Sequence, residues 1–559
     1  MESWDREKII FYIHNLNFDG MLLLNFLTLE KWEFRIFIHK FQIYSIKIYK
    51  NKRIIEFRCS YKIFPFSLKK INDIFNLNKQ LFLPFYFTED WNLSLQQESF
   101  DSYKEYANFY QSIDTKKIFD FKKDLIRLGK QKIEIIIAFL KIINRTLSSF
   151  QIDIKDIYSI SSWALKIFQK NFSKKKITFR YNCLEHNYLK NAYFGGRCEV
   201  YGNPKKEEKI FYYDFPGMYA QCMQEKFAYG ACEFKNNLSN YSHPGFYCIE
   251  YDSNLSYPIL PYKSVADQKL LFVNGRNTGI FWFEEIKLFE EMGGSVQNIL
   301  YGLIFENFDY VFQEYAKYFS NLRLQKKEFN LFGKLMINSL YGRLGMDSNE
   351  SCTIFIEKNE LVYYEKHFII LKLIEINFFY LLEIEINSLN KKYLKNSFNN
   401  VKSNIGLAAA VTSKARIKLY RAQQNIINNQ GRLLYSDTDS IFAAFSRDVS
   451  NETHGEVYWN SSSISDAVFL TSKSYGLLFN DGSSEIKIKG LHIDFLTFQN
   501  LKKKFYANET LIIDTFAISN KQFHLFQKIK NLEVLQTNSY SKRIFSIDKK
   551  STYPLKLKI

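Results

Sequence analysis

The chain has 559 residues, a length that allows several domains with cores of their own. Lysine and arginine outnumber aspartate and glutamate by 76 to 58, so the net charge is +18, and 18% of the residues are aromatic. This excess of cations with many flat rings fits a nucleic-acid binder, although charge alone fits a membrane surface nearly as well.

The cysteines and the apolar segments exclude further classes. The seven cysteines form no CxxC pair, which argues against a zinc ribbon or a disulfide framework and favours a reducing compartment. The first residues lack the charged-then-apolar order of a signal peptide. The longest apolar run, 368–386, carries four charged residues that are costly in hydrocarbon. We therefore expect no membrane span and no membrane partner.

The first predicted unit is a strand at 9–13 that runs into a polar turn and then into the apolar segment 21–24. In this turn Asn15 and Asp19 offer an amide and a carboxylate to a metal. An ordinary strand, turn and helix explains the pattern equally well. Residues 125–172 then show a helical periodicity, which we interpret as packing alone.

Paired glycines follow a basic linker. They let the backbone approach another group closely, and Tyr193 and Arg197 beside Gly195 and Gly196 suit stacking and phosphate binding. A plain glycine turn is the alternative.

Residues 210–213 are predicted to form a buried strand that ends in Asp214 before a turn at Pro216 and Gly217. An acid at the end of a buried strand is a candidate metal ligand, although a strand-end Asp that caps a turn is the alternative.

A single helix is predicted from Arg323 to Tyr341, with one polar face. On it five residues fall within a sector of about 60°: Arg323, Lys327, Lys334, Asn338 and Tyr341. Cations on this face can bind a triphosphate, and the tyrosine can pack against a base pair. A solvated charged stripe is the alternative.

Two apolar runs at 433–434 and 441–445 predict a hairpin whose turn holds Asp437 and Asp439. Such concentrated negative charge is tolerable mainly when a cation neutralises it, and oxygen ligands at a turn suit magnesium. An isolated acidic turn is more often an ordinary surface turn. Before the hairpin, 354–403 is interpreted as irregular and 406–427 as a small-residue helix. Beyond it stands the short pattern Lys473-Ser474-Tyr475. The lysines of segment 485–490 could add phosphate contacts, although a solvated strand face explains them equally well.

The segments YFGGR, DFPGMY, KLMINSLYG, YSDTDS and KSY stand in the order found in B-family DNA polymerases. The chain resembles the protein-primed branch of that family, of the mitochondrial linear plasmid or small bacteriophage type. In DFPGMY, Gly217 and Ala220 replace the common Ser and Pro. The resemblance implies an α+β fold: a right-hand polymerase with palm, fingers and thumb, preceded by a partial ribonuclease-H-like 3'-5' exonuclease domain.

The resemblance also implies site residues, by position in the motifs. Catalysis and metal binding fall to Asp214, Asp437 and Asp439, with Asp437 in an auxiliary role. Nucleotide binding falls to Tyr219, Arg323, Lys334, Asn338 and Tyr341. DNA binding falls to Tyr193, Gly195, Gly196, Arg197, Tyr435, Thr438, Lys473 and Tyr475.

The exonuclease part is predicted to be truncated and defective. Asn15 and Asp19 resemble the second exonuclease motif, and Asp124 is the preferred candidate for the third. The first motif, Asp-x-Glu on a strand, is expected upstream, where too little sequence precedes Asp19 to hold it.

We expect seven segments in chain order. They are an exonuclease-like domain at 1–172, a linker with the glycine motif at 173–197, a palm with a first terminal-protein-type insertion at 198–300, fingers at 301–345, a second insertion at 346–405, palm at 406–455, and the KxY region with the thumb at 456–559.

The implied reaction is template-directed addition of deoxynucleotides to a 3'-hydroxyl through two magnesium ions, with manganese as a substitute. The implied partners are template and primer DNA, deoxynucleoside triphosphates and a terminal priming protein. A mitochondrial location is expected, or else a cytoplasmic one. One alternative is a catalytically inactive DNA-binding remnant. The other is a reverse transcriptase or RNA polymerase, and the DTD turn argues against this second alternative.

Overall fold

The structure is a computed structural model. It describes residues 8–50, 53–77, 121–173, 177, 181–325, 327–346, 351–386, 390, 393–394, 403–449, 458–489, 496–509, 511–521, 524–535 and 542–557. The chain forms two compact units, and each takes in separate stretches of sequence. Unit 1 comprises Met1–Trp163, Lys326–Leu331 and Ser351–Tyr393, and unit 2 comprises Ala164–Gln325, Phe332–Glu350 and Leu394–Ile559.

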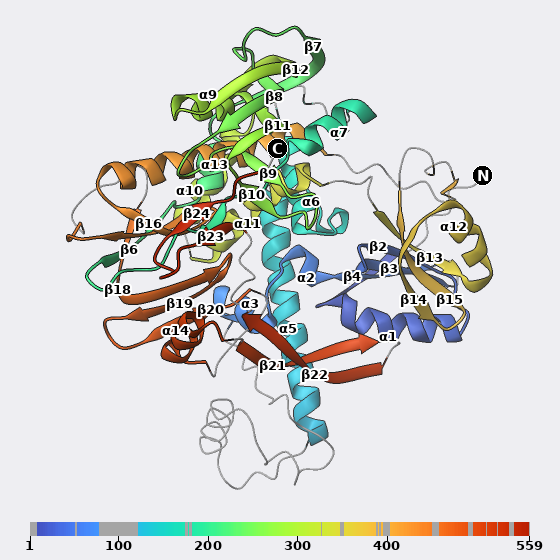
Figure 1. The fold of residues 1–559 in the computed structure, drawn as a ribbon. Coiled ribbons are helices and arrows are strands. Elements are labelled where there is room, and N and C mark those ends of the chain that lie inside the picture. Colours follow the sequence, from blue (N-terminus) through green and yellow to red (C-terminus); the bar gives the residue numbers. More distant parts are fainter. Residues whose placement is uncertain are drawn as a thin grey trace. The chain divides into compact units, whose positions relative to one another are not determined.

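Unit 1 is built on a four-stranded sheet in the order β1-β4-β3-β2 (Figure 1). Its strands are β1 (Lys8–Ile13), β2 (Phe34–His39), β3 (Gln42–Lys50) and β4 (Arg53–Cys59). β1 runs parallel to β4, and the other pairs are antiparallel. Helix α1 (Leu16–Leu29) packs on β3 through Leu16, Gly20, Leu24 and Leu27, which recur at helical spacing. The strand, turn and helix expected after residue 9 are therefore present.

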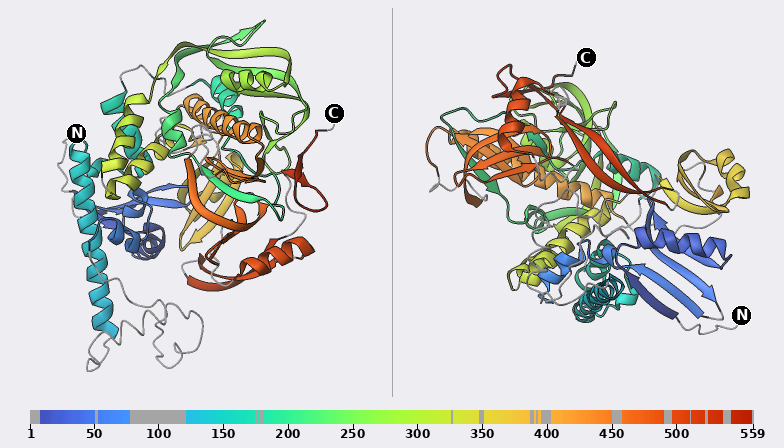
Figure 2. Two further views of the ribbon diagram at one scale, coloured as in Figure 1. Left: turned by 90° about the vertical axis from the view of Figure 1, so that its left-hand side faces the viewer. Right: turned by 90° about the horizontal axis from the view of Figure 1, so that it is seen from below.

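Helices complete the N-terminal part of the chain. They are α2 (Ser60–Ile63), α3 (Leu68–Ile74), α5 (Phe121–Ser148), η1 (Ile154–Asp156), α6 (Ile160–Ile167) and the π-helical turn η2 (Phe168–Phe172). Helix α5 stands out as the long cyan helix in Figure 2. The helical character predicted for 125–172 is confirmed. The first stretch of unit 1 ends at Trp163, ahead of the expected domain boundary at residue 172.

The prediction of an irregular segment at 354–403 is wrong for its described part. Residues 351–385 form β13 (Ser351–Glu357), η3 (Lys358–Glu360), α12 (Leu361–His367), β14 (Ile370–Ile376) and β15 (Phe379–Glu385), with the strands in the antiparallel order β13-β15-β14. The isoleucines and phenylalanines suit a pleated, half-buried surface. Phe355 and Phe379 pack against Phe34 of β2 at 5.6 and 6.3 Å between ring centroids, so this sheet belongs to unit 1.

Unit 2 is built on a seven-stranded antiparallel sheet in the order β20-β19-β18-β6-β17-β16-β5. The strands are β5 (Cys198–Val200), β6 (Lys209–Asp214), β16 (Arg432–Asp437), β17 (Ser440–Phe445), β18 (Tyr458–Thr471), β19 (Ser474–Phe479) and β20 (Ser484–Lys487). The predicted hairpin at 433–445 is thus confirmed, and the predicted strand before Asp214 pairs with it.

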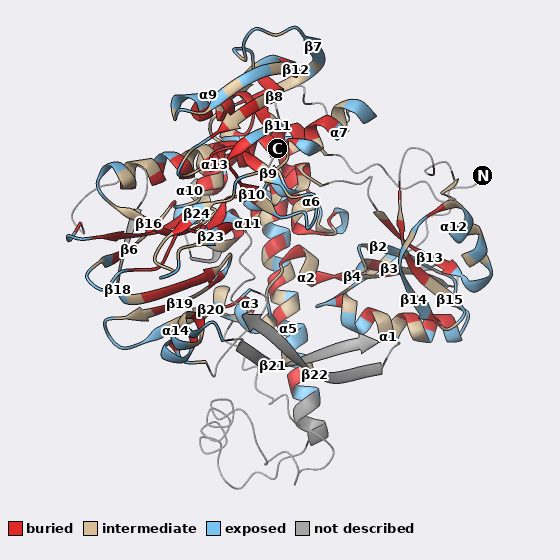
Figure 3. Ribbon diagram, in the orientation of Figure 1, coloured by how far each residue is buried: buried red, intermediate tan, exposed pale blue. Residues whose placement is uncertain are grey.

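The two faces of this sheet bury alternate residues of β17. Ile441, Ala443 and Phe445 pack towards α13 (Ile405–Asn428), whereas Phe442 and Ala444 join a cluster on the other face. In Figure 3, α13 and the central strands are the mainly buried elements of this unit. Helix α13 confirms the small-residue helix predicted at 406–427, since its alanines let it lie close to the sheet.

A second antiparallel sheet of unit 2 has the order β11-β8-β12-β7. Its strands are β7 (Lys226–Asn236), β8 (Gly245–Ser253), β11 (Gly275–Trp282) and β12 (Ser295–Tyr310). The rest of the unit consists of α7 (Cys183–Asn191), α8 (Met218–Cys222), β9 (Pro261–Lys263), β10 (Leu270–Phe272), α9 (Phe283–Glu291), α10 (Gln313–Gln325), most of α11 (Lys327–Leu344), α14 (Phe498–Ala507), β21 (Leu511–Lys521), β22 (His524–Leu535), β23 (Arg543–Phe545) and β24 (Thr552–Pro554).

The single helix predicted from Arg323 to Tyr341 is wrong. Helix α10 ends at Gln325 and α11 begins at Lys327. The two helices pack against each other, because the Tyr315 hydroxyl of α10 donates to the Met336 carbonyl of α11 at 2.9 Å. Arg323 and Lys334 therefore come from different helices.

In the described part of the chain, no helix combines the length and the apolar character that crossing a membrane would require.

A buried ion pair lies inside unit 1. The Glu56 carboxylate is 0% exposed and accepts hydrogen bonds from Arg58 at 2.8 Å and from the Tyr158 hydroxyl at 3.0 Å. Lys8 also lies 2.8 Å from it. Burial raises the pKa of Glu56, but the hydrogen bonds from Arg58 and Lys8 outweigh it and lower the pKa to about 2.

We expect Glu56→Gln to destabilise unit 1 at neutral pH by roughly 3–5 kcal/mol, because it leaves the Arg58 guanidinium buried without its carboxylate. The folded pKa is depressed, so the stabilisation is complete above the unfolded pKa and is lost as the pH falls towards 2. Thermal unfolding should therefore show the wild type and the variant converging as the pH drops from about 5 to about 3. Glu375→Gln, which removes an exposed partner of Lys358, is the control with little effect.

Candidate active site

Two carboxylates meet at the centre of the seven-stranded sheet. Asp214 is the last residue of β6, and its cross-strand partner on β17 is Ser440. Because Asp437 pairs with Ser440, Thr438 and Asp439 form a two-residue turn. The Phe215 N–H donates to the Asp439 carbonyl at 2.9 Å, which ties the two strand ends together. The sequence predicted a strand that ends in Asp214 and, separately, a hairpin whose turn holds Asp439. The two pair with each other, which places Asp214 beside Asp439.

The surroundings of these acids disfavour their charged forms. Burial raises the pKa of Asp214, and the nearby Lys334 ammonium offsets part of that rise. Burial also raises the pKa of Asp439, and the neighbouring Asp214 carboxylate raises it further. Two half-buried carboxylates therefore face each other with Lys334 as the cation that acts on both. Additional positive charge at this point would relieve their repulsion.

Asp437 has different neighbours. Its carboxylate accepts a hydrogen bond from the Thr438 hydroxyl at 3.1 Å and lies 3.8 Å from the Lys473 ammonium. The described residues contain no group of three or more Asp, Glu, His or Cys side chains placed to hold one metal ion. The arrangement therefore offers a metal the pair Asp214 and Asp439, with Asp437 as a neighbouring charge.

The glycine loop 193–197 packs against the acidic turn. A side chain at Gly196 would lie 2.7 Å from the Thr438 methyl group, so only glycine permits this approach. The Arg197 carbonyl accepts a hydrogen bond from the Thr438 N–H at 2.8 Å. Gly195 is exposed, with no atom within 4 Å of the position of a Cβ, and Tyr193 is half-buried beside Gly345. The loop thus supports the turn and presents Gly195 to solvent.

The structure corrects the expectation that Arg197 contacts DNA. Its side chain is 2% exposed and pairs with Glu199 at 2.7 Å, while its Nη1 donates to the Pro258 carbonyl at 2.8 Å. The guanidinium also lies over the Phe272 ring. Arg197 therefore holds the loop from the inside and presents no free guanidinium to a phosphate.

The expectation that Tyr435 contacts DNA is corrected in the same way. Its side chain is fully buried, and its ring stacks on Phe469 at 5.2 Å between centroids. Its hydroxyl accepts a hydrogen bond from the Lys473 N–H at 2.9 Å. Lys473 itself is exposed and has a left-handed backbone, with φ of 64°. Tyr435 thus positions Lys473 at the surface, and half-buried Tyr475 follows on β19.

Helix α11 presents one polar face. Lys334 and Asn338, four residues apart, are exposed, whereas Met336, Ile337 and Leu340 are buried. Tyr341 stacks on Tyr219 of α8, with ring centroids 4.3 Å apart and planes at 25°. Burial raises the pKa of Tyr219 to about 12, and it also raises the pKa of Tyr341. Both hydroxyls therefore stay protonated at neutral pH. The structure therefore brings Tyr219 of α8 into contact with Tyr341 of α11, two of the residues predicted to bind the nucleotide.

Arg323 reaches this group from α10. Its Nη1 lies 2.6 Å from the position that a Cβ of residue 217 would take, in the turn that follows Asp214. Its aliphatic stem packs against Gly333, the residue before Lys334. Arg323 and Lys334 are thus two cations near the acids, although they do not share a helix.

Sequence reasoning missed a charged network beneath the glycine loop. Arg416 of α13 makes a two-point contact with Glu285 of α9, with both N–O distances at 2.7 Å. Its Nη1 donates to the carbonyls of Phe194 and Gly195 at 2.9 and 3.1 Å. A charged residue inside an alanine-rich, buried helix was the available signal, because such a charge needs a partner. The partner itself, more than a hundred residues away in sequence, left no signal.

The predicted exonuclease residues lie in unit 1. Asn15 precedes α1 with a left-handed backbone, φ of 66°, and Asp19 lies in the first turn of that helix, where both are exposed. Asp124 falls on α5, but its side chain lies outside the described residues. Tyr110 and Asp114, which also have the spacing expected of the third motif, lie outside the described residues. The structure thus places the Asn15–Asp19 turn and leaves the rest of that site undetermined.

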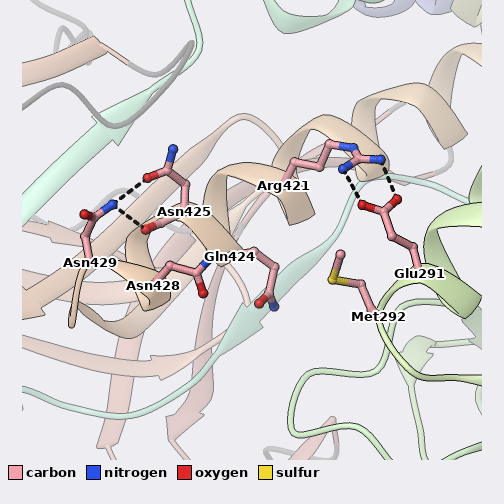
Figure 4. Close-up of a pocket in the computed structure, with 7 residues that line it drawn as sticks. All are labelled: Glu291, Met292, Arg421, Gln424, Asn425, Asn428 and Asn429. Atoms are coloured by element: carbon pink, nitrogen blue, oxygen red, sulfur yellow. Dashed lines mark hydrogen bonds and ion pairs between the residues drawn. The ribbon is translucent and has the colours of Figure 1, made fainter.

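A surface pocket of about 460 Å³ lies between α9 and α13. It is lined by Glu291, Met292, Arg421, Gln424, Asn425, Asn428 and Asn429 (Figure 4). None of these residues was predicted to belong to the site. Arg421 and Glu291 form an exposed ion pair there, with both contacts between 2.8 and 3.0 Å.

Residues 2–429 match the sequence model of the family described as DNA polymerase type B, organellar and viral. A probable DNA polymerase of Neurospora intermedia is 24% identical over 567 aligned positions, which cover 91% of this chain and 56% of that protein. A probable DNA polymerase of Podospora anserina is 26% identical, over 73% of this chain and 37% of its own length. The chain spans about half the length of the curated relatives it matches.

Among solved structures, phi29 DNA polymerase in complex with primer-template DNA and incoming nucleotides is similar with a TM-score of 0.66. The match covers 94% of this chain and 91% of that one at 18% identity. The expected right-hand polymerase architecture, of the α+β class, is therefore confirmed.

We expect Glu285→Gln to lower the stability of unit 2 by roughly 3–5 kcal/mol, because the Arg416 charge would stay buried without its partner. Glu291→Gln is a matched control, since it breaks an Arg–Glu pair between the same two helices. Its side chains are 49–55% exposed, so we expect a loss of about 0–1 kcal/mol. Thermal unfolding of both variants measures the difference, and equal losses would contradict the role assigned to burial.

Proposed function

The chain belongs to the organellar and viral type B DNA polymerases, and we propose that it is a template-directed DNA polymerase that adds deoxynucleotides to a 3'-hydroxyl. One observation carries this proposal: Asp214 ends β6 directly beside the two-residue turn that holds Asp439. Two facing carboxylates with raised pKa values fit the binding of divalent cations, which would restore their charged forms.

We propose that Asp214 and Asp439 hold two magnesium ions, which manganese can replace, and that Asp437 contributes an auxiliary charge. Magnesium bound there supplies positive charge that stabilises the phosphoryl group during its transfer. Water and substrate phosphates would supply the remaining ligands, since the described residues place no third carboxylate in the group.

The residues around the acids bind and orient the nucleotide. Lys334 and Arg323 carry the positive charge that a triphosphate needs, and Asn338 lies one turn beyond Lys334 on the same exposed face. The stacked rings of Tyr219 and Tyr341 offer a flat apolar surface to the sugar and base of an incoming nucleotide. Tyr219 is the residue that would exclude a 2'-hydroxyl.

DNA binding is assigned to the exposed parts of the same motifs. Lys473 lies in the turn between β18 and β19, 3.8 Å from the Asp437 carboxylate, where it can reach a primer phosphate. Gly195 and Tyr193 lie on the loop that supports the turn, so they are our candidates for contacts to the template strand. The similar phi29 enzyme has been solved with primer-template DNA and incoming nucleotides, which supports the choice of these partners.

We further propose that replication by this chain is primed by a terminal protein and serves a linear DNA in mitochondria. The organellar and viral family and the fungal relatives support this setting.

We expect Asp439→Ala to reduce primer extension by at least about a thousandfold, because it removes one of the two metal-binding carboxylates. The assay uses a primed single-stranded template, magnesium and the four deoxynucleotides. DNA binding should persist, because Lys473 and the glycine loop are unchanged. Asp437→Ala is the comparison variant and should lose less activity, since its carboxylate is engaged by Thr438 and Lys473. Extension by neither wild type nor variant, with DNA binding retained, would identify the chain as an inactive remnant.

The proposed loss of exonuclease function has its own test. We expect the purified 559-residue chain to leave 5'-labelled single-stranded DNA undegraded in magnesium, with the same background for wild type and Asp19→Ala. The proposed reason is that the described residues place no group of three or more Asp, Glu, His or Cys side chains around Asn15 and Asp19 that could hold a metal ion. Degradation from the 3' end that Asp19→Ala abolishes would show a working exonuclease.

A further inference from the structure

Gly217 departs from the family motif in which serine is common at that position, and the structure gives this departure a physical role. The residue has a left-handed backbone, with φ of 75° and ψ of 51°, at the start of α8. A Cβ at this position would lie 2.6 Å from Nη1 of Arg323 and 3.8 Å from its Cζ. Real Cβ atoms essentially never come that close to another atom, so any side chain at 217 would displace the guanidinium.

A second glycine holds the other end of the same arginine. A Cβ at Gly333 would lie 2.6 Å from Cγ of Arg323 and equally close to the Phe319 carbonyl of α10. Gly333 therefore lets α10 and α11 approach until the arginine stem fits between them. Phe319 and Phe332 close the same helix contact with ring centroids 6.1 Å apart. Arg323 is thus enclosed by glycines at its stem and at its head.

The guanidinium held in this way has free hydrogen-bonding capacity. Its Nε is buried and finds no hydrogen-bond partner among the described residues. A buried donor without a partner is costly. Such a group is suited to an anion that arrives with the substrate.

The position of the guanidinium identifies the anion. Gly217 lies three residues after Asp214, and Gly333 directly precedes Lys334, whose charge acts on both Asp214 and Asp439. Arg323 and Lys334 therefore flank the turn that follows the first acid. A polyphosphate is the substrate group that needs two cations beside a pair of metal-binding carboxylates.

We propose that Gly217 and Gly333 form a slot that fixes Arg323 as a ligand for the polyphosphate of the incoming nucleotide. The glycine that replaces the common serine thus leaves room for a guanidinium supplied by α10. Gly217 and Gly333 are positioning residues in this arrangement, and Arg323 makes the contact. This inference rests on the proposed polymerase function and names residues that act at the same site.

A double-mutant cycle tests the slot. We expect Gly217→Ala to raise the KM for deoxynucleotides about tenfold or more, with a smaller change in kcat, because it displaces one charged hydrogen-bond donor. Arg323→Ala should have a similar effect. In the Arg323→Ala background, adding Gly217→Ala should change KM by less than about twofold, because no guanidinium remains to be displaced.

Two further variants separate displacement of Arg323 from backbone strain. Gly217→Asn keeps the steric conflict but tolerates the left-handed backbone, so it should raise KM as Gly217→Ala does. Gly293→Ala places the same strain at φ of 91° with nothing within 4 Å, so it should leave KM unchanged. An equal effect of Gly217→Ala with and without Arg323, or an unchanged KM in both Gly217 variants, would overturn the proposal.

The proposal can fail separately from the polymerase function. If the wild-type chain extends no primer, the proposed function fails, and the same cycle is then measured by calorimetric titration with inorganic tripolyphosphate. Weaker binding in Gly217→Ala and Arg323→Ala, without further weakening in the double variant, would still support the slot. Equal binding by all four proteins would reject it.

Discussion

The pairing of β6 with β17 is the constraint on which the rest of unit 2 depends. It sets Ser440 opposite Asp214. Because Asp439 directly precedes Ser440 in the two-residue turn, it is placed beside that carboxylate. A shift of one residue would turn Asp214 to the opposite face of the sheet and bury its charge among the side chains that pack on α13. Residues 441–445 of β17 are apolar on both faces, so the register that keeps Asp214 away from the apolar cluster on α13 is the one that avoids burying its charge. The cost of burying this carboxylate thus helps to fix the register.

Around this pair, buried charges serve to hold polar loops in place. Arg197 and Arg416 are both buried arginines with carboxylate partners, and their contacts include the carbonyls of Pro258, Phe194 and Gly195. Such pairs add little net stability compared with apolar packing, but breaking one is costly. They therefore make the loop conformation specific. Lys334 and Lys473, the cations that remain available to substrates, are exposed. Arg323 is half-buried.

The sequence was sufficient where the signal is local. The hairpin at 433–445, the strand before Asp214 and helix α13 follow from patterns within about twenty residues, and the motif order identified the family. The interpretation failed where it assumed that one helix continues from Arg323 to Tyr341, and where it assumed that motif side chains are exposed. A period of 100° per residue places Arg323 and Lys334 on one face only if a single helix joins them, and two antiparallel helices do not. Nothing in the motif letters shows that Arg197 and Tyr435 point inward, because burial depends on partners such as Glu199 and Phe469. The sheet at 351–385 was missed because η3 and α12 interrupt the apolar pattern between its first and second strands.

The way in which the chain is divided between the units has a consequence for how it is made. Unit 1 draws on three separate stretches, and its last strands come after the first strands of unit 2. During synthesis, Phe34 of β2 is made about 320 residues before Phe355, so β2 must wait for Phe355 and Phe379. The central sheet of unit 2 waits longer still, because β6 needs β17. Contacts of this sequence separation slow folding, and they leave apolar strand edges uncovered in the meantime. Neither unit can be obtained as one continuous fragment, so the nascent chain depends on protection from aggregation until both are complete.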